Sequence, residues 1–134
     1  MTKQQTLDVK NLFNLAIKYQ KEKNFYKAKK LYQKILDFNP DFLEANNNLG
    51  LLFQFEKEYD KAIECYKKII DINPKILSAQ FNLGLVFQKM GKNENAKECY
   101  KKAIKLNPKL VNAQYNLGII FQKLGENENA KECY

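Results

Sequence analysis

Apolar residues recur through this chain at steps of three and four, the spacing that brings side chains onto one face of an α-helix. Leu49 and Phe53 belong to one such run, and Ala62 and Tyr66 belong to the next. A polar break near residues 57–58 separates the two runs. The pattern therefore predicts two amphipathic helices joined by a short turn.

This two-helix pattern recurs at a fixed step of 34 residues, from 39 to 73 and from 73 to 107. The step separates the three prolines of the chain, each of which follows an asparagine: Asn39-Pro40, Asn73-Pro74 and Asn107-Pro108. It also separates the Asn-Leu-Gly motifs, which lie at 48–50, 82–84 and 116–118, with Asn-Leu-Ala at 14–16. A repeat of this length is typical of a solenoid in which each helix pair stacks on the next.

Glycine and proline fix the expected helix boundaries. Proline disfavours helical geometry in the residue before it, so each Asn-Pro pair is expected to close a second helix. Gly91 and Gly125 fit the left-handed position at the end of a first helix. The glycine of Asn-Leu-Gly, replaced by Ala16 in the first repeat, is expected where only a small residue lets the paired helix approach.

The repeat resembles the tetratricopeptide repeat (TPR). The family pattern of Leu-Gly, an aromatic, Ala, a second aromatic and Pro is met by Leu49-Gly50, Phe53, Ala62, Tyr66 and Pro74. The resemblance implies an all-α fold, a right-handed superhelical solenoid of antiparallel helix pairs with about 3.5 repeats. We expect one such domain over residues 1–134. Its parts would be a polar segment at 1–8 and repeats at about 9–42, 43–76, 77–110 and 111–134, the last of them truncated.

The chain departs from the family pattern at one place. Where the family has tryptophan, three residues before the Leu-Gly pair, the chain has Leu12, Asn46, Gln80 and Gln114. This change is expected to weaken packing without changing the fold.

Every repeat keeps an asparagine at one further position of its first helix. On a helix, that residue shares a face with the residues three and seven positions later, about 100° from the apolar stripe. The resemblance implies that first helices line the concave surface, so we expect a groove there. Its rows are Asn14, Ile17 and Lys21; Asn48, Leu51 and Phe55; Asn82, Leu85 and Lys89; and Asn116, Ile119 and Lys123. A second polar row consists of Gln20, Gln54, Gln88 and Gln122.

The asparagine row predicts a non-enzymatic scaffold that binds an extended peptide or partner segment. A primary amide both donates and accepts hydrogen bonds, so it can pair with a peptide main chain. Such a ladder resembles those of TPR superhelices that bind peptides in this way. The aliphatic residues and lysines would favour apolar and acidic ligand side chains. The alternative is structural, with each amide bonded to a neighbouring helix or to water.

The chaperone-binding carboxylate clamp of the family is disfavoured. Phe13, Ile17, Ser78 and Asn82 stand where that clamp has cations, and the chain has no arginine.

Charge suggests a second class of function. The formal net charge is +8, and lysines recur on second helices at 67–68, 101–102 and 105. A basic convex surface could dock on an anionic partner such as RNA, lipid or a microtubule. Nucleic-acid readers favour arginine and stacking aromatics, so nucleic acid is disfavoured. A purely structural subunit of a larger assembly is a further alternative.

Catalytic and metal chemistry are not expected. Cys65, Cys99 and Cys133 are one repeat apart, too far for a disulfide or a converging zinc site, and are expected to be small apolar residues. The chain has no histidine, no glycine-rich phosphate loop and no evident carboxylate pair. We therefore expect no enzymatic activity, no metal and no cofactor.

The two ends complete the expectations. No signal peptide or membrane span is evident, which predicts an intracellular, cytoplasmic protein with protein or peptide partners. The fourth repeat stops early in its second helix, without the polar capping helix of most solenoids. Leu117 and Phe121 are expected to be partly uncovered there, so that the chain either continues as a longer array or self-associates.

Overall fold

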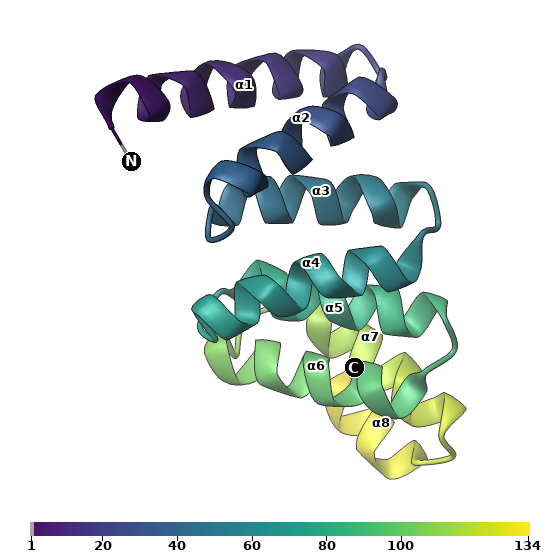
Figure 1. The fold of residues 1–134 in the computed structure, drawn as a ribbon. Coiled ribbons are helices and arrows are strands. Elements are labelled where there is room, and N and C mark those ends of the chain that lie inside the picture. Colours follow the sequence, from purple (N-terminus) through teal and green to yellow (C-terminus); the bar gives the residue numbers. More distant parts are fainter. Residues whose placement is uncertain (1) are drawn as a thin grey trace. The chain divides into compact units, whose positions relative to one another are not determined.

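The computed structural model describes residues 2–134, apart from the side chains of residues 127 and 128. Within that range the chain forms eight α-helices and no strand (Figure 1). They are α1 (Lys3–Lys21), α2 (Phe25–Phe38), α3 (Leu43–Phe55), α4 (Tyr59–Ile72), α5 (Leu77–Lys89), α6 (Asn93–Leu106), α7 (Val111–Lys123) and α8 (Asn127–Cys133). The expected all-α architecture of helix pairs is confirmed.

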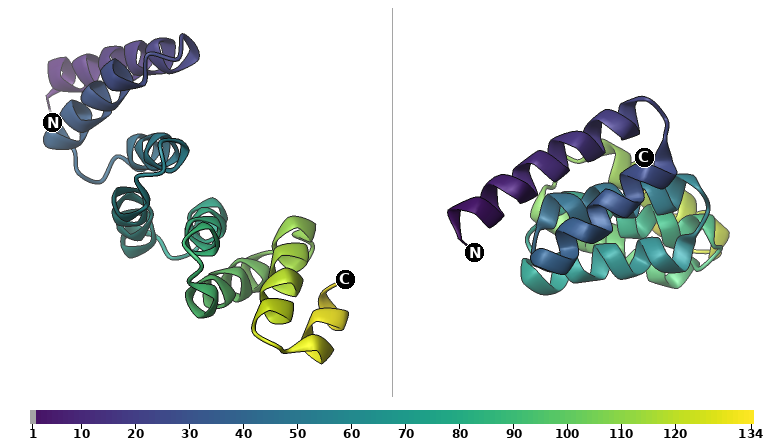
Figure 2. Two further views of the ribbon diagram at one scale, coloured as in Figure 1. Left: turned by 90° about the vertical axis from the view of Figure 1, so that its right-hand side faces the viewer. Right: turned by 45° about the horizontal axis from the view of Figure 1, so that its top comes forward.

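The chain divides into two compact units, Met1–Ile69 and Ile70–Tyr134. In unit 1, α1 packs on α2 and α2 packs on α3. In unit 2, α5 packs on α6, α6 on α7 and α7 on α8 (Figure 2). Each unit thus contains two successive first helices and the second helix between them, which is the arrangement that positions the candidate site.

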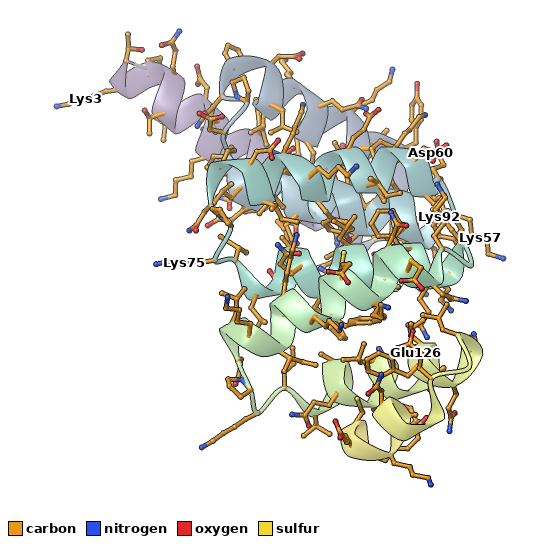
Figure 3. All side chains as sticks on the ribbon, turned by 90° about the horizontal axis from the view of Figure 1, so that it is seen from below. Lys3, Lys57, Asp60, Lys75, Lys92 and Glu126 are labelled. Carbon is orange, nitrogen blue, oxygen red and sulfur yellow. The ribbon has the colours of Figure 1, made fainter. Side chains whose placement is uncertain are left out.

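Every first helix ends in the same hydrogen-bonded turn. After α3, the N–H of Lys57 donates to the carbonyl of Gln54 at 3.0 Å, and the N–H of Glu58 donates to that of Phe53 at 2.8 Å. This pair of bonds is the Schellman motif, which needs one residue in the left-handed region. The residues in that region are Lys23, Lys57, Gly91 and Gly125, with φ of 62°, 62°, 75° and 78°. The side chain of Lys57 points into solvent from this turn (Figure 3).

The Asn-Pro pairs end the second helices as the sequence predicts. Asn39 is the C-cap of α2 and Asn107 is the C-cap of α6. The side-chain oxygen of Asn39 accepts the N–H of Asp41 at 3.2 Å, and that of Asn107 accepts the N–H of Lys109 at 3.0 Å. These bonds fix the short connection before the next first helix.

A tyrosine from the second helix packs against the small residue of the first helix. Tyr66 and Tyr100 are fully buried. A Cβ added to Gly50 would lie 2.9 Å from Tyr66 Cε1, and one added to Gly84 would lie 2.8 Å from Tyr100 Cε1. The close approach explains why glycine stands in the Asn-Leu-Gly motif.

The first helix differs from the later ones on its outer face. Thr2 and Gln5 form a capping box, so α1 begins at Lys3 and includes most of the polar segment at 1–8. Leu15 is 39% exposed, whereas the equivalent Leu49 of α3 is 4% exposed. Lys18 likewise stands where α3 has a buried leucine. This face of α1 is therefore less buried than the same face of α3.

Candidate peptide-binding groove

In unit 1 the expected groove residues lie on α1 and α3. Asn14 and Lys21 are exposed, and Ile17 and Asn48 are half-buried. Phe55, at the end of α3, is 71% exposed. The remaining residues of these rows are Leu51, which is exposed, and Gln54, which is half-buried. All of them are accessible to some degree, because their helix face is turned away from the buried Leu49 and Phe53 stripe.

In unit 2 the corresponding residues lie on α5 and α7. The amides of Asn82 and Asn116 are half-buried. Lys89 and Lys123 are exposed. The other members are Leu85, Gln88 and Ile119, all half-buried. This part of the row therefore combines amides, aliphatic groups and two solvated cations.

The asparagine amides belong to a hydrogen-bonded network with the buried tyrosines. In unit 1, Asn48 Nδ2 donates to the hydroxyl of Tyr32 at 3.2 Å. The same hydroxyl donates to Gln20 Oε1 at 2.6 Å. In unit 2, Asn116 bonds the hydroxyl of Tyr100, which donates to Gln88 Oε1 at 2.5 Å. Each network joins two first helices through the second helix between them.

The tyrosine-to-glutamine bond occurs in all four repeats. The other two copies are Tyr66 to Gln54 at 2.9 Å and Tyr134 to Gln122 at 3.0 Å. The glutamine row is thus bonded to protein through one side-chain oxygen, which leaves its N–H groups as donors. Sequence reasoning did not find these tyrosines as partners, although each follows its glutamine by 12 residues, the separation of every one of the four pairs.

Burial disfavours ionisation of the tyrosine hydroxyls, which are protonated at neutral pH even with the ordinary pKa. It raises the pKa of Tyr66 and Tyr100 well above the usual range. Burial also raises the pKa of Tyr32, and the hydrogen bond from Asn48 opposes that shift. A protonated hydroxyl can donate to glutamine while it accepts from asparagine, which is the arrangement observed.

The three consecutive asparagines of α3 have different surroundings. Asn46 is 1% exposed, and its Nδ2 donates to the carbonyl of Pro40 at 3.1 Å. Asn47 Oδ1 is buried without a hydrogen-bond partner. Asn48 bonds Tyr32 and retains one N–H and its Oδ1. Two of the three therefore offset the poor helix propensity of asparagine with tertiary hydrogen bonds.

An aromatic pair distinguishes the groove of unit 1. The rings of Phe25, at the start of α2, and Phe55 meet edge to face with centroids 5.2 Å apart. In unit 2 the equivalent residues are Asn93 and Lys123. The same surface is therefore apolar in one unit and polar in the other.

Lysines on the second helices fall into two groups. Lys29 pairs with Glu56 at 2.8 Å and with Glu58 at 3.4 Å, and Lys97 pairs with Glu94 at 2.9 Å and with Glu126 at 3.4 Å. The pairs with Glu56, Glu58 and Glu126 tie a second helix to the turn after the following first helix, whereas Lys97–Glu94 lies within α6. The second group, which the sequence assigns to a basic convex surface, is exposed: Lys67, Lys68, Lys101, Lys102 and Lys105.

The expectation for the last repeat is wrong in one respect. Leu117 and Phe121 are each only 6% exposed, because their stripe faces the preceding second helix, where Lys101 Nζ lies 5.8 Å from the Phe121 ring centre. The exposed apolar groups of this repeat are instead Val111 (69%), Tyr115 (57%) and Tyr134 (58%), and the two tyrosine rings contact each other at 5.8 Å.

The three cysteines lie at equivalent positions of the second helices α4, α6 and α8. None of the three cysteines forms a disulfide, and Cys65 and Cys99 are buried. Burial raises the pKa of the Cys65 thiol to about 11, which disfavours the reactive thiolate. No group of three histidine, cysteine, aspartate or glutamate side chains is placed to hold a metal ion among the described residues. None of the helices in that range combines the length and the hydropathy needed to span a bilayer.

Family profiles of the tetratricopeptide repeat match residues 9–42 and 43–76, and a TPR-repeat profile matches residues 89–125. The chain belongs to the tetratricopeptide-repeat family. A search of curated protein sequences returned no match.

Solved structures of MamA are similar to this chain. One MamA crystal structure has a TM-score of 0.89 and 25% identity over 94% of this chain and 69% of that chain. A second has a TM-score of 0.85 and 27% identity over 89% and 70%. A MamA fragment from Desulfovibrio magneticus RS-1 has a TM-score of 0.85 and 21% identity over 93% and 71%, a likeness of fold alone. The family and these structures support the general role of a protein–protein interaction scaffold.

Proposed function

We propose that this protein binds an extended peptide segment of a partner protein along the asparagine face of its first helices, without catalysing a reaction. The observation that carries the proposal is the placement of amides with unused hydrogen-bonding groups beside accessible apolar and cationic side chains. Asn48, for example, uses one N–H for Tyr32 and keeps its remaining N–H and its oxygen for a ligand.

The spacing of the repeat suits an extended main chain. Packed helices lie about 8–10 Å apart, and an extended peptide advances about 3.3 Å per residue, so each repeat meets the ligand about every three residues. Hydrogen bonds with a net contribution of about 1 kcal/mol each, less the ordering cost, correspond to modest affinity in the micromolar range.

Side chains along the same face would select among ligands. The lysines Lys21, Lys89 and Lys123 favour acidic residues, and the Phe25–Phe55 pair favours an apolar residue over unit 1. The ligand is therefore an extended, acidic peptide with apolar side chains.

The test begins with a peptide library that is titrated against the protein. For each peptide that binds, Asn14→Ala is expected to weaken binding, because the exposed amide of Asn14 serves the ligand alone in this proposal. Asn95→Ala, an exposed asparagine on α6, is the matched control and should leave affinity unchanged. N-methylation of the bound peptide's own amides should abolish binding, since it removes the main-chain donors.

Equal affinity of the Asn14→Ala protein, or tolerance of N-methylation, would show that the amide ladder does not bind the main chain.

A second candidate function uses the exposed lysines of the second helices. Lys67, Lys68, Lys101, Lys102 and Lys105 support docking on an anionic partner. Sedimentation with RNA, anionic vesicles and microtubules at rising salt separates the three, and binding that survives high salt would count against an electrostatic mode. If the protein binds neither a peptide nor an anionic partner, the remaining alternative is a purely structural role within an assembly.

We also propose that the exposed Tyr115–Tyr134 pair supports self-association. In this proposal, light scattering would report a rising mean mass with protein concentration, and Tyr115→Lys would lower it. A single monomeric mass at high concentration would contradict the proposal.

A further inference from the structure

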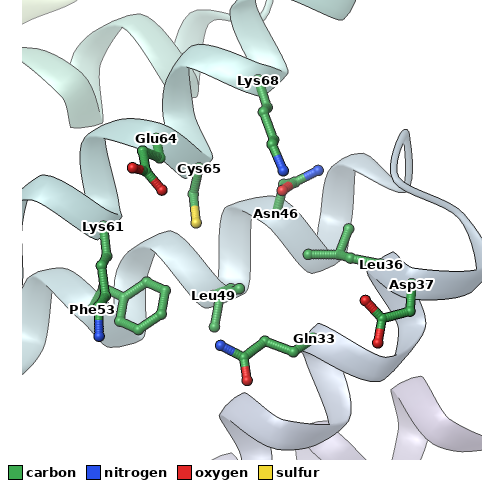
Figure 4. Close-up of a pocket in the computed structure, with 10 residues that line it drawn as sticks. All are labelled: Gln33, Leu36, Asp37, Asn46, Leu49, Phe53, Lys61, Glu64, Cys65 and Lys68. Atoms are coloured by element: carbon green, nitrogen blue, oxygen red, sulfur yellow. The ribbon is translucent and has the colours of Figure 1, made fainter.

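Each unit contains a cleft on the side of the second helices, separate from the groove residues. In unit 1 a cleft of about 350 Å³ lies over α3 (Figure 4). Leu49 and Phe53 of α3 form its floor, Leu36 of α2 forms one wall, and Cys65 of α4 forms the other. The cleft therefore lies between two second helices, and its floor is largely covered, since Leu49 is 4% and Phe53 is 6% exposed.

Unit 2 contains the same cleft two repeats further along the chain. Its volume is about 490 Å³. The floor consists of Leu117 and Phe121, and the walls include Ile104 and Cys133. The floor, the walls and the thiol thus lie at equivalent positions in the two clefts.

The residue at the edge of each cleft occupies the family's tryptophan position. Asn46 lines the first cleft and Gln114 lines the second. Both side chains bond the main chain of the preceding connection: Asn46 Nδ2 lies 3.1 Å from the carbonyl of Pro40, and Gln114 Nε2 lies 2.6 Å from that of Pro108. The amides are held at the edge of the cleft, and the chain has no tryptophan to fill it.

We propose that each cleft binds the indole ring of a tryptophan side chain presented by a partner protein. The floor and walls offer the apolar contacts that an aromatic ring needs, and the cysteine sulfur adds a favourable contact with its edge. A buried indole also requires an acceptor for its N–H. Glu64 lines the first cleft and Glu132 lines the second, so a carboxylate is available at the equivalent place in both.

Charge at the rim of the first cleft is compatible with an aromatic guest. Lys61 and Lys68 line it, and Lys61 Nζ already lies 5.5 Å from the centre of the Phe53 ring. A second aromatic face would provide the same cation–π attraction. The cleft shares none of the asparagine-face residues, so the inference does not depend on the proposed peptide groove.

The absence of tryptophan from the chain gives a direct assay, because indole fluorescence then reports the probe alone. N-acetyl-tryptophanamide titrated with the protein is expected to shift its emission to shorter wavelength as the ring leaves water. A dissociation constant of about 1 mM is expected for a single side chain. N-acetyl-leucinamide should compete weakly.

Variants that fill the clefts decide where the probe binds. Asn46→Phe and Gln114→Phe should each remove one of two sites, and the double variant should weaken binding at least about tenfold. Val111→Phe adds the same side chain at a position that is 69% exposed and outside both clefts, and should change nothing.

If circular dichroism shows that Asn46→Phe fails to fold, Cys65→Leu fills the first cleft with the residue found at the equivalent position 31. An unshifted probe emission at millimolar protein would overturn the inference. Undiminished binding by the double variant, or by Cys65→Leu in the Gln114→Phe background, would also overturn it.

Discussion

Units 1 and 2 contain the same helix pairs and the same buried contacts but differ in the residues that face solvent. The left-handed turn residue is Lys57 in unit 1 and Gly91 in unit 2. The aromatic pair that Phe55 forms with Phe25 corresponds to a lysine and an asparagine in unit 2. In both units, by contrast, a buried tyrosine bonds glutamine and asparagine from two first helices.

This difference separates what the fold requires from what recognition can vary. The small residue and the tyrosine at the closest helix approach, such as Gly50 with Tyr66 and Gly84 with Tyr100, keep their residue type, because a change there meets packed atoms. Positions on the open face change between lysine and phenylalanine without altering a helix boundary. The two units therefore provide each other's matched controls.

The largest effect is expected where the helices approach most closely. Gly50→Val and Gly84→Val place a branched side chain against Tyr66 and Tyr100, and each should lower the free energy of unfolding by about 3 kcal/mol. Urea unfolding of both variants measures it. Losses that differ greatly between the two would show that the units are not equivalent in packing.

The tyrosine networks are expected to contribute next. Tyr32→Phe and Tyr100→Phe leave the glutamine and asparagine groups of each network without their hydroxyl partner. Each should lower the free energy of unfolding by about 2 kcal/mol. Thermal unfolding with a tyrosine outside the networks, Tyr26→Phe, as the control tests this, since Tyr26 is 65% exposed. No loss in either variant would assign the stability to the rings alone.

One substitution in unit 1 is expected to raise the free energy of unfolding. Asn47 Oδ1 is buried without a partner, and the equivalent residues of the other repeats are aromatic: Phe13, Phe81 and Tyr115. Asn47→Phe should raise the free energy of unfolding by about 1 kcal/mol, because it removes an unsatisfied acceptor and adds a ring beside Tyr66. A lower midpoint in urea would contradict this account.

Exchanging the residues at the left-handed turn position should stabilise unit 1 and destabilise unit 2. Lys57→Gly should stabilise by about 0.5–1 kcal/mol, since glycine adopts positive φ without strain. Gly91→Lys should lose a similar amount, through backbone strain alone, because a Cβ at Gly91 meets no atom within 4 Å. Differential scanning calorimetry measures both, and shifts of the same sign would refute the explanation.

The smallest effect is expected from the ion pairs of unit 1. The hydrogen bond from Lys61 is the largest cause of the lowered pKa of Glu58; desolvation opposes it, and a smaller effect of the hydrogen bond from Lys29 adds to the lowering. A lowered pKa stabilises the folded state above the ordinary carboxyl pKa of 4.5, and this contribution is lost as pH falls through the lowered value. Glu58→Gln should make the free energy of unfolding fall less steeply at acidic pH (the acid limb of the plot of stability against pH). An unchanged acid limb would show that the pair contributes nothing measurable.

Much of the fold followed from the sequence because its rules are local and repeated. The Asn-Pro pairs end the second helices, and Gly91 takes the left-handed turn position, as the sequence predicts. Lys57 in the same conformation was not evident, because lysine has no preference for positive φ and only the surrounding hydrogen bonds hold it there.

Helical periodicity also placed Asn48, Leu51 and Phe55 on one accessible face. It did not identify Tyr32 as the partner of Asn48, because the two residues meet only through the distance between packed helices. The exposure expected for Leu117 was wrong for a related reason, since burial depends on which neighbouring helix a face contacts.

The sequence by itself determined the helix pairs, their boundaries and the membership of each face, because these depend on backbone preferences and a 3.6-residue period. The tertiary structure decided which amides are already bonded, which aromatic rings stay in solvent and where the clefts lie beside Asn46 and Gln114. Those properties depend on angstrom-scale distances between helices, and no spacing along the chain encodes such distances.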